Sequence, residues 1–127
     1  MAQVLSEDHM AAGTASLNED AGFAAAMNNV DLSLQFSVTD APEGEIDYYL
    51  TVGDGVAVLA LGTLEDADAS VASDYETAAA ISKGELNVQM AFMTGKIKVG
   101  GNMAKVMMYQ GLINEFARVS STLDLDF

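Results

Sequence analysis

The side chains of this sequence that could do acid, base or nucleophilic chemistry are few and poorly placed for it. The chain has one histidine, His9, and no cysteine, so thiolate nucleophiles, disulfides and thiolate metal sites are all excluded. A Ser-His pair would have to use His9, and no serine lies in a Gly-x-Ser-x-Gly turn. His9 falls in a polar N-terminal stretch that we expect to be mobile. The sequence therefore predicts a protein that is not an enzyme and has no catalytic residue.

Acidic side chains are abundant, but they lack the spacing of a known cation site. Asp66 and Asp68 form one group, and Glu43, Glu45 and Asp47 form another. A calcium loop needs ligands at fixed intervals, a glycine at its sharp turn and a bidentate acid at its end. Neither group has that pattern, so we interpret both as solvated surface charges and expect no metal and no cofactor.

The segment Gly53-Asp54-Gly55 has the glycines of a phosphate-binding loop but the wrong context. A phosphate loop opens a helix, whose first amides then meet the phosphate. Here the segment leads into Val56–Leu61, which has the composition of a strand. We therefore interpret it as the tight turn of a β-hairpin.

The charge of the chain excludes whole classes of partner. Nineteen acids against five basic residues give a net charge of −14, which argues against nucleic acid and predicts repulsion from anionic membranes. All the basic residues follow position 82, so an anion site must lie in the second half. The acidity is also typical of proteins that stay hydrated in a saline habitat, which we state as a hypothesis about the source.

Five methionines crowd into nineteen positions of the second half: Met90, Met93, Met103, Met107 and Met108. Methionine is unbranched and polarizable, so it adapts to apolar ligands of varying shape. The same side chains at helical spacing also serve as ordinary core. Taken alone, the pattern leaves core and ligand pocket open.

The helices and strands that must position these side chains begin after residues 1–16, in which apolar residues show no sustained periodic spacing. We expect a flexible N-terminal arm over residues 1–16 and a single domain over residues 17–127. Leu17, Ala21, Ala24 and Met27 recur at spacings of three and four, which predicts a helix from about Asn18 to Asn28.

Strict alternation of apolar and polar residues then predicts a β-hairpin. One strand runs from Val30 to Thr39 and its partner from Ile46 to Val52, with turn residues Ala41-Pro42-Glu43-Gly44 between them. Val56–Leu61 is apolar on both faces. That pattern predicts either a central strand or an outer face covered by the N-terminal helix or by another subunit.

The second half predicts two more strands among helices. Ser73 and Glu76 have the spacing of a capping box, in which Ser73 is the N-cap of a helix. Asn102 is placed to cap a long last helix. The expected elements are a strand over Asp68–Ser73, a helix from about Tyr75 to Lys83 that ends at Gly84, a helix from about Asn87 to Gly95, a strand over Gly95–Gly100 and a helix from Asn102 to about Ser120.

A series of short motifs follows this order of elements. They are Ala69-Ser70-Val71-Ala72, Ser73-Asp74-Tyr75, Gly84-Glu85-Leu86-Asn87, Met90-Ala91-Phe92-Met93, Gly95-Lys96-Ile97-Lys98-Val99 and Gly101-Asn102-Met103. Together they resemble the signature stretch of the sterol carrier protein 2 family, and the resemblance covers roughly Leu17 to Val119. It implies an α/β (α+β) fold in which helices cover one side of a five-stranded, mostly antiparallel sheet and enclose an apolar tunnel.

The resemblance also implies a function, which is to bind and shuttle fatty acid, fatty acyl-CoA, phospholipid or sterol. We expect the lipid to contact apolar side chains from strands and helices and to enter by movement of the last helix. These side chains are Leu34, Phe36, Leu50, Met90, Met93, Ile97, Val99, Met103, Val106, Met107 and Phe116. Lys96, Lys98 and Lys105 are candidates to bind a headgroup, although alternating lysines also serve to protect an edge strand.

An alternative interpretation keeps the fold but fills its core. The apolar last helix, with Met108, Leu112 and Val119 as surplus side chains, would then form a homodimer or dock an enzyme of lipid metabolism. No apolar run approaches the roughly 18 to 20 residues that cross a bilayer. The N-terminal residues also lack the pattern of a secretory signal, so we expect a cytoplasmic protein without stable membrane insertion.

Overall fold

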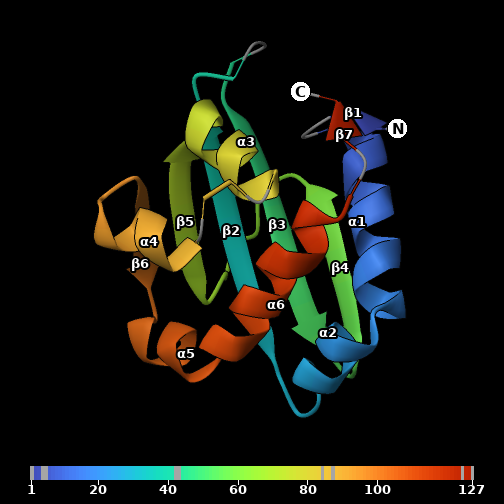
Figure 1. The fold of residues 1–127 in the computed structure, drawn as a ribbon. Coiled ribbons are helices and arrows are strands. Elements are labelled where there is room, and N and C mark those ends of the chain that lie inside the picture. The colour runs from blue at the N-terminus through green and yellow to red at the C-terminus, as the bar shows by residue number, and fades with distance from the viewer. Residues whose placement is uncertain are drawn as a thin grey trace.

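A five-stranded sheet forms the base of the molecule, with helices packed over one face (Figure 1). The computed structural model describes residues 2–3, 6–41, 44–83, 85–86, 88–123 and 125–126. The strands stand in the order β4-β3-β2-β5-β6, and every neighbouring pair is antiparallel except β2 and β5. The expected mostly antiparallel sheet is confirmed. Its members are β2 (Leu32–Thr39), β3 (Ile46–Gly53), β4 (Val56–Leu61), β5 (Ala69–Asp74) and β6 (Ile97–Gly101).

The predicted hairpins occur where the alternation places them. Leu32 pairs with Val52 and Leu34 with Leu50, so the apolar faces of β2 and β3 fall on one side of the sheet. The tight turn between β3 and β4 has Asp54 and Gly55 at positive φ angles of 53° and 75°, as such a turn requires. In the turn before β3, residues 42 and 43 lie outside the described residues.

The N-terminal region differs from the expected arm, because residues 7–16 belong to helix α1 (Glu7–Glu19). Ser6 caps this helix by accepting a hydrogen bond from the amide of His9. His9, Met10 and Gly13 are buried. The sequence pattern missed the helix because small residues such as Ala11, Ala12 and Gly13 give a weak apolar period. The proposed start of the domain at residue 17 stays a prediction.

Helix α1 covers β4, which is an edge strand rather than a central one. Its side chains also pair with the strand backbone. The side-chain amide of Asn18 accepts a hydrogen bond from Ala57 N at 2.9 Å and donates one to Ala57 O at 2.8 Å. The hydroxyl of Thr14 likewise accepts from Leu59 N and donates to Leu59 O. The predicted cover of the outer face of this strand is wrong, because Val56 and Val58 on that face are 53% and 41% exposed. The helix that contacts the strand begins at Glu7, ahead of the predicted helix over Asn18–Asn28.

Asp20 divides the predicted helix over Asn18–Asn28, since α1 ends at Glu19 and a new helix begins at Ala21. Its side chain accepts from the amide of Phe23, which caps a new helix, α2 (Ala21–Ala26). Arg118 from the last helix forms an ion pair with the same carboxylate. The chain can therefore change direction at Asp20, and Phe23 reaches the core.

The second half follows the predicted order with two differences. Asp74, not Ser73, caps the first helix, because its carboxylate accepts from Thr77 N at 2.7 Å. The long last helix breaks at Tyr109 into α5 and α6, so α5 lies beside β6 while α6 crosses the sheet (Figure 1). Gly84 and Asn87 lie outside the described residues. The helices are α3 (Tyr75–Ser82), α4 (Val88–Met93), α5 (Met103–Met108) and α6 (Gln110–Ser121).

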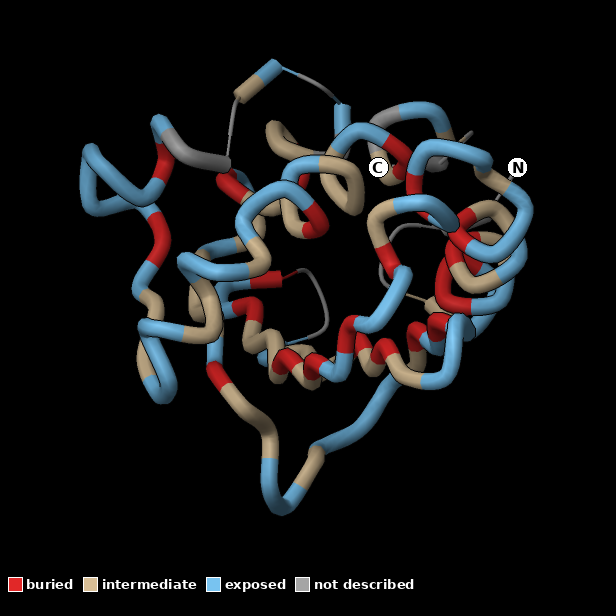
Figure 2. Tube along the Cα trace, turned by 90° about the horizontal axis from the view of Figure 1, so that it is seen from below, coloured by how far each residue is buried: buried red, intermediate tan, exposed pale blue. Residues whose placement is uncertain are grey.

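The two chain ends meet in a short parallel pair of β1 (Ala2–Gln3) and β7 (Leu125–Asp126). The packed core lies between the sheet and helices α1, α2 and α6. Figure 2 shows that buried residues run along the strands and along the helix sides that face them. Residues of this core include Leu17, Phe23, Met27, Leu32, Leu34, Leu50, Val52, Leu112 and Val119.

Candidate functional site

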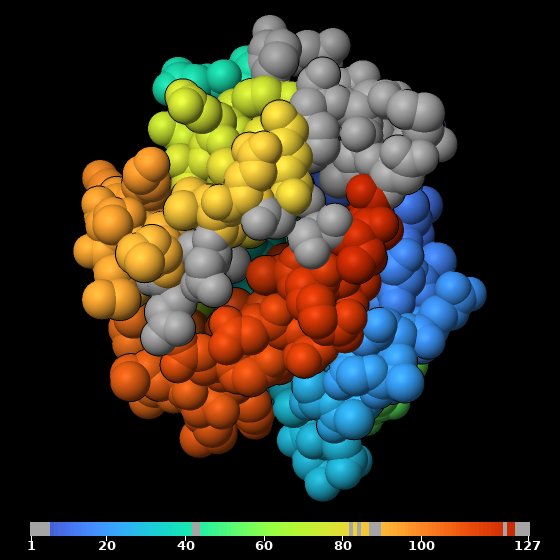
Figure 3. Space-filling model, viewed as in Figure 1, coloured from blue at the N-terminus to red at the C-terminus, as the bar shows by residue number. Residues whose placement is uncertain are grey.

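A cavity of about 390 Å³ lies between the apolar face of the sheet and the helices. Strands β2 to β6 supply its floor, and α3, α4, α5 and α6 supply most of its walls. On the face seen in Figure 3 the surface is hollowed between α3 and α6. The described lining residues include no Asp, Glu, Lys or Arg. The space therefore suits an apolar molecule.

Nine of the eleven predicted lipid-contacting side chains line this cavity. They are Leu34, Phe36, Met93, Ile97, Val99, Met103, Val106, Met107 and Phe116. The other two lie elsewhere. Leu50 is fully buried in the packed core, and the side chain of Met90 is 54% exposed on the outside of α4.

Sequence reasoning missed several lining residues that carried a visible signal. On β3, Tyr48 lies in the same alternating register as Leu50. On α6, Gln110, Ile113 and Ala117 follow the spacing of three and four that includes Phe116. His9 has no signal in the sequence, because it reaches the cavity only when α1 docks on β4. Leu59 pairs with Leu50 and alternates with the exposed Val58, so it lies on the apolar face of the sheet. The remaining missed residues are Val71, Ser73, Ala78, Ile81, Phe92, Asn114 and Ser120.

Aromatic rings stiffen the part of the wall that β2, β3 and α6 share. Phe36 and Tyr48 stack with ring centroids 4.7 Å apart, and Phe116 packs against Phe36 at 5.8 Å. Phe36 and Tyr48 are direct partners in the antiparallel register. Burial raises the pKa of the Tyr48 hydroxyl, so this wall stays uncharged at neutral pH.

His9 is the titratable group of the cavity wall whose ordinary pKa is closest to neutrality. Burial lowers the pKa of its imidazole below the usual 6.5, because a charged ring loses hydration there. His9 is thus neutral at pH 7. The expectation that it lies in a mobile stretch is wrong, since it is 5% exposed within α1.

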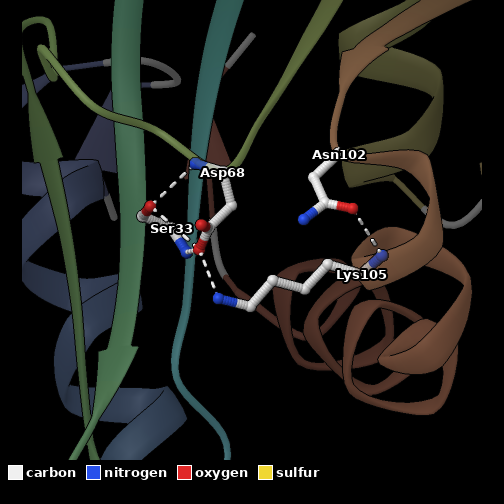
Figure 4. A network of polar contacts seen from close by, with 4 residues as sticks. All are labelled: Ser33, Asp68, Asn102 and Lys105. Carbon is white, nitrogen blue, oxygen red and sulfur yellow. Dashed lines mark hydrogen bonds and ion pairs between the residues drawn. The ribbon is translucent and has the colours of Figure 1, made fainter.

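The three lysines proposed for a headgroup do not line the cavity. Lys96 and Lys98 are exposed, and Lys98 lies between Ile97 and Val99, which face the cavity. Lys105 turns instead to the carboxylate of Asp68, with Nζ 2.9 Å from Oδ2 (Figure 4). Their role in binding a headgroup stays a prediction, and for Lys105 it would require the ion pair to open.

Asp68 joins the strands to α5 through several contacts (Figure 4). Its carboxylate accepts from Ser33 N at 2.9 Å and Ser33 Oγ at 3.2 Å, besides Lys105. Its carbonyl accepts from Asn102 N at 2.8 Å. Partial burial opposes ionisation, but the hydrogen bonds from Lys105 and Ser33 outweigh it and lower the pKa of Asp68. This acid is therefore structural, not part of a cation site.

Comparison of the sequence with models of protein families identifies the family to which the chain belongs. The model of the SCP-2 sterol transfer family matches residues 14–114. The chain belongs to this family. Its members supply a general precedent for lipid binding and transfer, and most of them are carriers without catalysis.

Individual members of the SCP-2 family agree with this assignment. Sterol carrier protein 2 of Gallus gallus is 32% identical over 78 residues, which are 61% of this chain. The match covers 14% of that protein, so the chain spans about one seventh of the curated relative.

Solved structures of the SCP-2 family share the fold. A crystal structure of sterol carrier protein 2 has a TM-score of 0.82 at 22% identity and covers 96% of this chain and 100% of its own. The solution structure of palmitated SCP2L2 from Aedes aegypti has a TM-score of 0.61 at 19% identity, with 95% and 97% covered. At these identities the likeness establishes the fold alone.

Two observations limit other kinds of site in the described part of the chain. None of its helices combines the length and apolar content needed to span a bilayer. Within the same residues, no three His, Cys, Asp or Glu side chains gather closely enough to hold a metal ion.

Proposed function

We propose that this chain is a non-catalytic carrier that holds the apolar part of a lipid in the cavity between sheet and helices. The observation that carries the proposal is an apolar space of about 390 Å³ whose described lining has no charged side chain. Its volume falls in the range of ligand pockets, which is roughly 300 to 1,000 Å³. Packing this space with side chains would have been more stable, so an open cavity is best explained by an occupant.

The driving force for binding is removal of a hydrocarbon tail from water. Each methylene contributes about 0.8 kcal/mol, so a dozen carbons supply roughly 10 kcal/mol before the entropic cost of binding. No polar contact is needed for that affinity. The flexible side chains of Met93, Met103 and Met107 would fit tails of different shape. Broad specificity follows.

The ligand class that we favour is a fatty acid or fatty acyl-CoA, with phospholipid and sterol as further candidates. A carboxylate or phosphate deep in the cavity would meet no lysine or arginine in the described lining, and His9 is neutral there. The polar end should therefore face the opening, with the tail inside. The palmitated relative is consistent with an acyl tail.

Catalysis has little support in the same geometry. The polar side chains of the lining are His9, Tyr48, Ser73, Gln110, Asn114 and Ser120. His9 and Tyr48 are held in their neutral forms by burial. A hydrolytic site needs an activated nucleophile beside a base and an orienting partner. The chain has no cysteine and a single histidine, so His9 would have to be that base.

The alternative of a dimerisation or docking module has weaker support than it had from the sequence. Leu112 and Val119, two of the side chains that appeared surplus, are buried in the packed core. Only Met108 of the three is exposed, at 71%.

A cavity-filling substitution tests the proposed function. In Ala117→Phe, the new ring would occupy space beside Phe116, so we expect at least a ten-fold loss of affinity for a fluorescent fatty acid with no loss of stability. Ala11→Phe, at an exposed site on α1, is the control and should bind like wild type. Absence of saturable binding to wild type, or equal binding to Ala117→Phe, would contradict the proposal.

A further inference from the structure

The buried end of the cavity differs in its chemistry from the open side. Gln110 and Asn114 line the cavity where it is open, since both side chains are exposed to water. His9, Tyr48 and Ser120 also line the cavity, and His9 is 5% exposed. Burial of a polar side chain in apolar surroundings is costly. Polar groups at the inner end of a space for hydrocarbon therefore need an explanation.

The docking of α1 on β4 brings His9 and Tyr48 to the same end of the cavity. The hydroxyl of Thr14 bonds the backbone of Leu59. One helical turn before Thr14 and two strand residues after Leu59, the same spacing places the start of α1 beside Leu61. Leu61 is the register partner of Tyr48 on β3. His9, in the first turn of α1, therefore lies near the part of β3 that carries Tyr48.

The last turn of α6 reaches this end as well. A Cβ at Gly13, one turn after His9, would lie 3.8 Å from Cδ1 of Leu123, and Leu123 N donates to Ser120 O at 3.3 Å. The pairing of β1 with β7 holds the two chain segments together. Figure 1 shows the start of α1 and the end of α6 together, with α4 and α5 on the far side of the molecule. We call His9, Tyr48 and Ser120 the polar end.

The polar end offers hydrogen bonds without charge. Burial lowers the pKa of the His9 imidazole and raises the pKa of the Tyr48 hydroxyl, so both groups are neutral at pH 7. A neutral imidazole has one N–H donor and one acceptor nitrogen, and a hydroxyl can donate or accept. These groups match a hydroxyl or a carbonyl oxygen. A carboxylate would need a cation, and the described lining has no lysine or arginine.

From this placement we infer that the cavity takes acyl lipids that carry a hydroxyl or carbonyl group at the buried end of the chain. That oxygen hydrogen-bonds at the polar end while the headgroup stays at the opening. The inference rests on the proposed function and narrows its ligand class to lipids oxygenated at the chain end opposite the headgroup. An unsubstituted chain also fits, but it gains no hydrogen bond there.

The path between the two ends suits the hydrocarbon of such a lipid. Gln110 and Ser120 stand about 15 Å apart along the axis of α6, and both line the cavity. Phe36, Val106 and Phe116 contribute apolar wall to the same cavity. A hydroxyl in the middle of the chain would meet this apolar wall, whereas a hydroxyl at the chain end would meet the polar end. The position of the oxygen should therefore decide affinity.

Competition against a fluorescent fatty acid tests the inference on the wild-type protein. The probes are a saturated fatty acid at the chain length that binds best, the same acid with a hydroxyl at the chain end, and an isomer with the hydroxyl at mid-chain. We expect the end-hydroxylated acid to bind at least about ten-fold more tightly than its isomer, because a buried hydroxyl without partners loses its hydrogen bonds to water. The isomers have the same composition, so their difference reports position alone.

Two variants locate the interaction. His9→Leu removes the imidazole, and Tyr48→Phe removes one hydroxyl while keeping the ring that stacks on Phe36. We expect the advantage of the end-hydroxylated acid over its isomer to fall about ten-fold in His9→Leu and several-fold in Tyr48→Phe. The two affinities are compared within each variant, so a general change in the cavity cancels. Tyr49→Phe, on the opposite face of β3, is the matched control and should keep the wild-type advantage.

The outcomes separate this inference from the proposed function. Equal binding of the two hydroxylated isomers to wild type overturns the polar end as a ligand site, and so does an advantage that persists in both His9→Leu and Tyr48→Phe. If the unsubstituted acid still binds saturably in that case, the carrier function stands. Absence of saturable binding of all three acids refutes the carrier and the polar end with it.

Discussion

His9 shows how the surroundings of one side chain change its protonation. In a mobile arm it would titrate like a free imidazole, but within α1 it lies in the cavity wall and is 5% exposed. The partial positive charge at the start of a helix acts in the same direction as burial. Glu7 and Asp8 in the same turn oppose both, but they are exposed, so water screens them.

The titration of His9 is a direct prediction. It is the single histidine, so its ring protons need no assignment, and NMR should give a pKa below 6.5. Because the unfolded state then binds more protons, stability is full above pH 6.5 and falls as the pH drops through that value toward the lower folded pKa. His9→Phe should flatten the dependence of the melting temperature between about pH 5 and 7. A measured pKa at or above 6.5 would refute the burial of this side chain.

The docking of α1 on β4 depends on a match between the spacing of two helix side chains and the spacing of two strand residues. Thr14 and Asn18 are four residues apart on a helix, about 6 Å along its axis. Leu59 and Ala57 are two residues apart on a strand, about 6.8 Å along it. The two side chains can therefore bond consecutive outward groups of the strand. In this way the helix satisfies a sheet edge that would otherwise be open to pairing with another chain.

We expect Asn18→Ala to reduce the free energy of unfolding by roughly 1 to 3 kcal/mol, because it leaves the amide and carbonyl of Ala57 without their partner. Urea denaturation measures the loss, and hydrogen exchange of the Ala57 amide should accelerate. Asn28→Ala, at an exposed site after α2, is the control and should stay within about 0.5 kcal/mol of wild type. Slow exchange at Ala57 in Asn18→Ala would contradict the edge pairing.

A pair of glycines tests how β6 connects to α5. Gly101 has a φ angle of 92°, and a Cβ there would lie 2.7 Å from Asp68 O. Gly101→Ala should therefore destabilise the fold by roughly 2 to 4 kcal/mol. Gly111, within α6, has no heavy atom within 4 Å of such a Cβ, so Gly111→Ala should raise stability by up to about 1 kcal/mol. Thermal and urea unfolding would compare the two, and similar effects would refute the tight approach at Gly101.

For the whole molecule, charge is the dominant global property. A net charge of −14 on 127 residues produces repulsion among acids that opposes the compact state. Nineteen acids face five basic residues, among which Lys105 pairs with Asp68 and Arg118 pairs with Asp20 and Glu115. Salt should therefore act mainly by screening repulsion, which agrees with the hypothesis of a saline source.

Raising sodium chloride from about 0.02 to 0.3 M should increase the melting temperature by about 3 to 6 °C. Differential scanning calorimetry at constant pH measures the shift. In this range screening dominates over the strengthening of apolar burial that concentrated salts cause. An unchanged or lower melting temperature would show that the acids contribute little net repulsion.

The sequence alone determined the strands of the hairpins and the side of the sheet that is apolar. Alternation of period two leaves a strand such as β2 one way to face the core, so the pattern by itself places Leu34 and Phe36 on the apolar face. The second-half motifs predicted α4, β6 and the start of the last helix, and through them much of the cavity wall. These features are local, since each depends on residues close together in the chain.

Only the tertiary structure decided which helix covers which strand and what remains empty. His9 reaches the cavity because α1 docks on the edge strand β4, which is distant in the sequence, with Thr14 and Leu59 separated by 45 positions. Leu50 and Leu34 are paired across β3 and β2 and lie on the same face of the sheet. Leu50 is enclosed in the packed core, whereas Leu34 also borders the cavity. A periodic pattern reports which face a side chain takes, whereas a void is the space left after distant elements have packed, and no local pattern encodes it.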